Sequence, residues 1–224
     1  MEPFETERHQ IVEACRILVA QGYLAATGGN VSLRLPGRDG IAVTPSNLDY
    51  ARLAPGDVCI LDGNLNLLAG GHKPSVESGM HAAVYGARPD VHAIVHTHQV
   101  YASALALIKA SIPALFDEQA RFLGRSVDVI PYAPSGTGLL KGQIARHVRD
   151  GHNAYILQNH GALCFGHDME RALNNVEILE KCSLAYLLAL CTGQKVTKIP
   201  LPVREIAFAR LRRDQKRAGE VENP

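Results

Sequence analysis

The stretch VHAIVHTH, residues Val91–His98, carries three of the chain's ten histidines. Its apolar residues lead directly into His96 and His98, and they predict a buried strand. Side chains two positions apart on a strand point to the same face, so His96 and His98 lie side by side, with Thr97 turned away. Imidazole is a common ligand of zinc and other divalent metals. The strand therefore predicts one half of a metal site.

Helical and strand patterns alternate on both sides of this strand. Apolar residues at helical spacing predict helices over residues 5–21, 75–87, 99–108, 138–149, 169–191 and 203–217. Short apolar or alternating segments, separated by Gly, Pro, Asn and Asp, predict strands at NVSLRL, GIAVT, DVCILD, LNLLAG, AIVHTH, DVIPY and AYILQNHGALCFG. This order predicts an α/β fold in which helices cover a central sheet.

Length and composition set bounds on the organisation. The 224 residues fit a single catalytic domain over residues 1–200, followed by a basic helix and tail over 201–224. The net charge of +1 provides no field for nucleic acid or acidic lipid, so neither a nucleic acid nor a membrane is an expected partner. The five cysteines form no CxxC pair. With no signal peptide and no apolar span, we expect a cytoplasmic protein.

A metal site needs at least one more ligand from elsewhere in the chain. His160 follows the apolar segment AYIL, at a break next to a glycine. Glu77 stands at the start of the helix predicted over 75–87, with Ser75 as its N-cap, where backbone amides favour a carboxylate. The alternative is that the histidines are ordinary core residues. We assign a structural role to His92, and to His81 either packing or the support of a ligand residue.

Such a set of residues supports carbon-acid chemistry. A metal held by three neutral imidazoles keeps its charge and acts as a Lewis acid on a carbonyl or diolate. A nearby carboxylate can then transfer a proton. Together they allow an enediolate to form and break, which is the step shared by retro-aldol cleavage, epimerisation through cleavage, and decarboxylation of an oxo acid.

The ordered motifs ATGGNVS, VTPS, KPSVE, VHTH, PYAPSGT and QNHGA resemble the class II aldolase and adducin head family over residues 5–193. The resemblance implies a single αβα domain with a mainly antiparallel sheet and a homotetramer with active sites between subunits. It implies one divalent metal ion per chain on His96, His98 and His160, with zinc expected first and manganese, iron or cobalt also accepted. Glu77 would be the catalytic acid/base group and would also coordinate the ion when no substrate is bound.

The same resemblance implies a phosphate pocket built from three loops. Its residues would be Gly29, Asn30, Ser46, Asn47 and Ser75. Relatives that act on sugar phosphates carry a Thr/Ser-Gly pair in the second loop and two serines in the third, whereas this chain has Asn47 and Val76 at those places. Because fewer close amides and hydroxyls remain, a weaker phosphate grip is expected. The substrate would be a small molecule that carries a phosphate or a carboxylate.

The segment FDEQARFLG occupies the family's region for a second proton donor. Asp117 falls where fuculose-phosphate aldolase has a tyrosine, and Arg121 falls where ribulose-phosphate 4-epimerase has an aspartate. Asp117 and Arg121 could supply an acid and an anion clamp. A solvated run of charges is the competing interpretation.

Three hypotheses follow from the sequence. The first is a metal-dependent aldolase that cleaves a small ketose phosphate or related hydroxy ketone through a metal-stabilised enediolate. The second is a metal-dependent decarboxylase of an oxo acid or hydroxylated aromatic acid on the same fold. The third is a non-catalytic interaction module, which the complete set of Glu77 and three histidines disfavours.

Overall fold

A computed structural model describes residues 4–221, and within this range nine strands form one sheet. The strands are β1 (Asn30–Arg34), β2 (Gly40–Val43), β3 (Cys59–Asp62), β4 (Leu67–Ala69), β5 (Ala93–Thr97), β6 (Ile112–Pro113), β7 (Ser126–Ile130), β8 (Ala154–Leu157) and β9 (Gly161–Gly166). Their order is β4-β3-β2-β1-β5-β9-β8-β7-β6. Neighbours pair antiparallel except β7 and β8, which are parallel.

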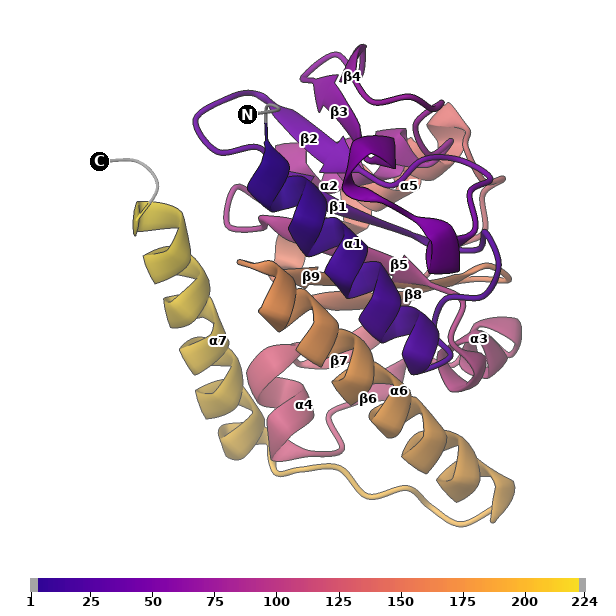
Figure 1. The fold of residues 1–224 in the computed structure, drawn as a ribbon. Helices are drawn as coiled ribbons and strands as arrows, with labels where there is room; N and C mark the ends of the chain where they lie inside the picture. The colour runs from indigo at the N-terminus through magenta and orange to yellow at the C-terminus, as the bar shows by residue number, and fades with distance from the viewer. Residues whose placement is uncertain (1–3, 222–224) are drawn as a thin grey trace.

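Helices cover both faces of this sheet (Figure 1). They are α1 (Glu5–Ala20), α2 (Ser78–Ala87), α3 (Val100–Leu107), α4 (Asp117–Phe122), α5 (Gly138–His147), α6 (Met169–Cys191) and α7 (Leu201–Val221). Residues of α1, α3 and α6 share one buried apolar cluster with the sheet, and residues of α2 and α5 share another on the opposite face. These layers confirm the predicted α/β fold with a central, mainly antiparallel sheet between helices.

The strand that carries VHTH lies at the centre of the sheet. On β5, Ala93 and Val95 belong to the cluster beneath α1 and α6, whereas Ile94 belongs to the cluster beneath α2 and α5. Strand parity therefore places His96 on the α2 side. All five residues of β5 are buried, so polar groups on this strand need partners inside the protein.

Strand β1 pairs with β5, and its side chains likewise alternate between the two faces of the sheet. Val31 and Leu33 pack beneath α1 and α6. Asn30 and Ser32 consequently face α2, and both are buried. The register pairs Asn30 with His96. Two neighbouring strands thus bring polar side chains to the same region under the start of α2.

Two expected boundaries beside the histidines and Glu77 were wrong. The helix predicted to begin after Ser75 begins at Ser78, with Glu77 in the N-cap position. Residues 75–78 form a separate turn instead, because the Ser78 amide and hydroxyl both donate to the carbonyl oxygen of Ser75, at 3.1 and 2.7 Å. The strand predicted through His98 ends at Thr97, since the chain turns there into α3.

The C-terminal part of the chain, predicted as a basic helix and tail over 201–224, contains α7; residues 222–224 lie outside the described residues. Helix α7 lies beside α4 (Figure 1). Two ion pairs connect α7 with the rest of the domain, Arg121 with Asp214 and Arg125 with Glu205. None of the described helices is long and apolar enough to cross a membrane.

We expect Gly161→Ala to lower the free energy of unfolding by about 1–3 kcal/mol, because overpacking forces backbone shifts. A Cβ at Gly161 would lie 2.4 Å from the carbonyl oxygen of Thr97 and 2.7 Å from Cδ2 of His98. Gly142→Ala is the matched control: it lies in α5 with open space around it, and alanine should stabilise that helix by about 0.5–1 kcal/mol. Urea unfolding measures both, and equal stability of Gly161→Ala and the parent would contradict the close packing of β9 on β5.

Candidate active site

Three imidazoles converge at the ends of the central strands. His96 is the fourth residue of β5, His98 follows that strand, and His160 lies in the turn between β8 and β9. Their rings are neighbours, with centroids 4.7 to 5.4 Å apart. One ligand nitrogen of each lies within 4.8 Å of the others. His160, which is distant in sequence, therefore meets the two predicted ligands His96 and His98 at one point.

Hydrogen bonding and burial prepare these rings to hold a cation. The Nδ1–H of His96 donates to the carbonyl oxygen of Ala162 at 2.8 Å, which leaves Nε2 with a free lone pair. Nε2 of His98 lies 3.1 Å from Nε2 of His96. Burial lowers the pKa of His96 to about 3 and also lowers the pKa of His98. Neutral imidazole is the form that binds metal, so these residues fit a divalent ion.

The carboxylate of Glu77 completes this cluster. Its Oε2 lies 3.3 Å from Nε2 of His96, and its Oε1 lies 3.2 Å from Nε2 of His160. Glu77 is only 6% exposed. A carboxylate at this place can act as a further metal ligand or as a proton acceptor for a substrate bound beside the ion.

Three donors hold Glu77 in its ionised form. Asn30 Nδ2 donates to Oε2 at 2.7 Å, and the Ser135 hydroxyl donates to Oε1. Burial by itself would raise the pKa of Glu77. The hydrogen bonds from His160 and Ser135, together with nearby imidazoles, outweigh this effect and hold the pKa well below its usual range.

Ser135 was not among the residues predicted from the sequence. It lies in the loop that precedes α5, within the motif PYAPSGT, where Gly136 adopts a φ of +69°. The motif marked this loop, but no spacing rule connects it with Glu77, 58 residues earlier. Only the packing of α5 beside α2 brings the hydroxyl to the carboxylate.

The first expected substrate loop lies directly against the histidine strand. A Cβ at Gly29 would fall 2.5 Å from the carbonyl oxygen of His96, and Gly29 has a φ of +80°. Only glycine is compatible with both conditions. Asn30 follows it, with its amide on Glu77.

The second and third expected loops are joined to each other. Pro45 and Pro74 form an isolated β-bridge, and the Ser46 amide and hydroxyl donate to the carbonyl oxygens of Lys73 and Pro74, both at 2.9 Å. Asn47 adopts a φ of +58°, the left-handed conformation that glycine and asparagine tolerate best.

Ser75 is turned inward in the third loop. Its hydroxyl accepts a hydrogen bond from the Glu77 amide at 3.2 Å. The neighbouring Val76 is 70% exposed. The third loop therefore presents an apolar side chain to solvent beside Glu77.

Asp117 and Arg121 are not brought to the histidine cluster in this chain. Both lie on α4, and with Val203, Ile206 and Arg210 they line a hollow against α7. Arg121 forms an ion pair with Asp214 of α7. Any part they take in catalysis would require a site other than the one built by their own chain.

A second group of potential metal ligands lies away from the cluster. Asp128, Asp150 and His152 also come within 4.8 Å of one another, but Asp150 already accepts hydrogen bonds from the His152 amide and Tyr155 hydroxyl. Nδ1 of His152 lies 3.2 Å from Asp150, and burial lowers the pKa of His152, so Asp150 is engaged mainly by these two hydrogen bonds.

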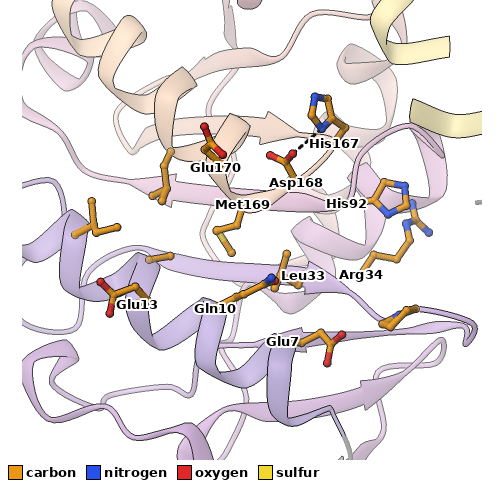
Figure 2. Close-up of a pocket in the computed structure, with 14 residues that line it drawn as sticks. Glu7, Gln10, Glu13, Leu33, Arg34, His92, His167, Asp168, Met169 and Glu170 are labelled. Carbon is orange, nitrogen blue, oxygen red and sulfur yellow. Dashed lines mark ion pairs between the residues drawn. The ribbon is translucent and has the colours of Figure 1, made fainter. Parts of the chain in front are cut away.

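A cavity of about 590 Å³ lies between α1 and the start of α6. Figure 2 shows Glu7, Gln10 and Glu13 of α1 across from Asp168 and the residues after it. No residue of the histidine cluster lines this cavity. The histidine cluster therefore remains the candidate active site.

Comparison with known proteins identifies relatives of this chain. L-fuculose phosphate aldolase of Escherichia coli strain K12 is 34% identical over 181 residues, which cover 80% of this chain and 82% of that protein. The 5-deoxy-D-ribulose 1-phosphate aldolase of Bacillus thuringiensis serovar kurstaki is 32% identical over 190 residues, covering 85% and 88%.

Solved structures also include a similar aldolase. That of an L-fuculose 1-phosphate aldolase superposes with a TM-score of 0.87 at 30% identity, covering 92% of this chain and 96% of that one. The family model described as Class II Aldolase and Adducin N-terminal domain matches residues 9–187. The chain thus belongs to the class II aldolase and adducin N-terminal domain family, as its motifs indicated.

Proposed function

We propose that this aldolase-type lyase cleaves a small ketose 1-phosphate in a metal-dependent retro-aldol reaction. The observation that carries the proposal is the convergence of three imidazoles with the buried carboxylate of Glu77. Three neutral ligands leave the charge of a divalent ion undiminished. His96, His98 and His160 would hold one ion per chain, zinc first, and Glu77 would fill a fourth position until substrate arrives.

The chemistry divides between the ion and the protein. A bound divalent ion would supply Lewis-acid polarisation of the substrate oxygens. Cleavage breaks the C3–C4 bond of the ketose, the C4 hydroxyl loses its proton, and the electron pair remains on the C2–C3 fragment as an enediolate. Glu77, ionised before substrate binds, would accept a proton and return it to C3. Ser135 and Asn30 would hold its two oxygens in place.

A phosphorylated substrate is supported by the three loops and by the relatives. Proteins 34% and 32% identical to this chain are named for L-fuculose phosphate and 5-deoxy-D-ribulose 1-phosphate. Gly29, Asn30, Ser46, Asn47 and Ser75 would form the phosphate pocket. The Ser75 hydroxyl is already engaged with the Glu77 amide, and Val76 offers no donor. We therefore expect a weaker phosphate grip than a pair of free serines would give.

We also propose a cytoplasmic homotetramer whose sites lie between subunits. Large apolar side chains around the site are exposed, including Val76, Val100, Leu139 and Tyr132, and burial between subunits would remove them from water. Asp117 and Arg121 would then serve a neighbouring site. Light scattering coupled to size exclusion measures the assembly directly.

Product analysis separates aldol cleavage from decarboxylation. The metal-loaded enzyme is incubated with L-fuculose 1-phosphate, with 5-deoxy-D-ribulose 1-phosphate, and with oxo acids and hydroxylated aromatic acids. We expect an aldehyde from the ketose phosphates and no CO2 from the acids. Release of CO2 without aldehyde would establish decarboxylase activity in place of aldol cleavage.

We expect His98→Ala to lose the bound metal and the activity while it remains folded, because His98 lies beyond the end of β5 and its ring contributes a ligand. Elemental analysis of untagged protein should give close to one divalent ion per chain for the parent and almost none for the variant. His9→Ala, at an exposed position on α1, is the matched control and should keep its metal. Full metal content in His98→Ala would remove His98 from the ligand set.

We expect Glu77→Gln to retain metal but to slow turnover by ~100-fold or more, because the amide cannot shuttle a proton. Steady-state cleavage of L-fuculose 1-phosphate measures the change. Glu13→Gln, on a side chain that is 64% exposed, should leave turnover unchanged. Equal turnover in the parent and Glu77→Gln would eliminate the proposed proton transfer.

A further inference from the structure

A line of buried polar side chains runs from Glu77 into the interior between β1 and α2. Glu77, His81 and Tyr85 are spaced four residues apart and share one face of α2 and its N-cap. Asn30 and Ser32 are two apart on β1 and face the same helix. All five residues are at most 6% exposed.

Each member of this line contacts the next. Asn30 Nδ2 lies 2.7 Å from Glu77 Oε2, and Asn30 Oδ1 contacts Nε2 of His81. Nδ1 of His81 lies 2.6 Å from the Ser32 hydroxyl, which lies 2.8 Å from the Tyr85 hydroxyl. The line is continuous, and no member depends on water for its partner.

The donor and acceptor groups fix the direction of the hydrogen bonds along this line. The Glu77 carboxylate can only accept, so the amide nitrogen of Asn30 must face it. Asn30 therefore presents its oxygen to His81, and that oxygen needs an N–H on Nε2. In a neutral imidazole the other nitrogen, Nδ1, is then an acceptor.

The two hydroxyls extend this direction to the end of the line. Ser32 must donate to Nδ1 of His81, and the Tyr85 hydroxyl donates to Ser32. Burial supports the neutral imidazole, since it lowers the pKa of His81 to about 4. Every donor consequently points toward Glu77.

Packing leaves little freedom for a different arrangement. His81 is fully buried, and turning the Asn30 amide over would set its oxygen against the Glu77 carboxylate and its N–H groups against the N–H of His81. An unsatisfied buried polar group costs about 1–3 kcal/mol. Both ring nitrogens of His81 have partners, as a buried imidazole requires.

We propose that His81 is a positioning residue that sets the orientation of the Asn30 amide and, through it, holds the Glu77 carboxylate in its reactive position. The side chain of His81 hydrogen-bonds with Asn30 and Ser32, so it acts on the Glu77 carboxylate through Asn30. The expected effect of His81 on kcat rests on the proposed function. The structural part of the proposal, the tautomer of His81, stands independently of any substrate.

Two substitutions separate hydrogen bonding from packing. His81→Leu keeps an apolar side chain in the space but removes both bonds. His81→Gln keeps a donor for Asn30 and an acceptor for Ser32. We expect His81→Leu to lower kcat by about tenfold or more, in the range of a misplaced acid/base group, with KM changed much less. His81→Gln should recover most of kcat, and both variants should retain one metal ion per chain.

Asn175→Leu provides a matched control for loss of a buried polar group. Asn175 lies on α6, is fully buried and donates to the carbonyl oxygen of Phe165 at 2.7 Å. It should lose stability comparably to His81→Leu but keep the kcat of the parent. If His81→Leu turns over L-fuculose 1-phosphate as fast as the parent, or if His81→Gln is as slow as His81→Leu, the positioning role is contradicted.

Nuclear magnetic resonance tests the tautomer without substrate. Long-range proton–nitrogen correlations of ¹⁵N-histidine-labelled parent protein, assigned with His81→Gln, should show His81 neutral with its proton on Nε2. A proton on Nδ1 would overturn the proposal, even if the enzyme is an aldolase. An absence of aldol cleavage with the Nε2–H tautomer present would instead contradict only the proposed function.

Discussion

The need to stabilise one buried carboxylate governs the site. Transfer of an ionised carboxylate from water into a protein costs several kcal/mol unless donors or cations replace its hydration. Glu77 receives an amide from Asn30 and a hydroxyl from Ser135, and two imidazoles lie within 3.3 Å. These groups come from two strands, a loop and a turn that are far apart in sequence. The satisfied anion therefore links the sheet to both α2 and the loop before α5.

The sheet makes this convergence possible because its central strands are antiparallel and closely packed. Strand β5 lies between β1 and β9, so the ends of three segments meet around His96. Glycines allow the close approach: Gly29 and Gly161 both stand where a Cβ would collide with the backbone of residues 96 and 97. The polar face of β1 and the buried face of α2 then extend the site inward. His96 lies on a strand, and His98, His160 and Glu77 lie at the ends of strands or of a helix, which favours a preorganised centre.

Much of this was predictable from the sequence, and the exceptions have physical causes. Strand parity and imidazole chemistry identified His96 and His98, and helix α6 was predicted with its exact bounds, Met169–Cys191. The start of α2 was missed because a local serine turn competes with helix initiation. Ser135 could not be found, since its contact with Glu77 depends on how α5 packs. Asn30 and Ser32 carried a signal, because polar residues alternate within an apolar strand, but their partners on α2 emerge only from the tertiary structure.

The central claim is that His96, His98 and His160 together bind one divalent ion at the carboxylate of Glu77. Anomalous diffraction from crystals of the purified protein, recorded on both sides of the absorption edge of the metal found in it, locates that ion directly. The account predicts one strong peak per chain, bonded to Nε2 of all three histidines at about 2.0–2.1 Å if the ion is zinc. A peak at other residues, or none at the three rings in protein that contains metal, would contradict it.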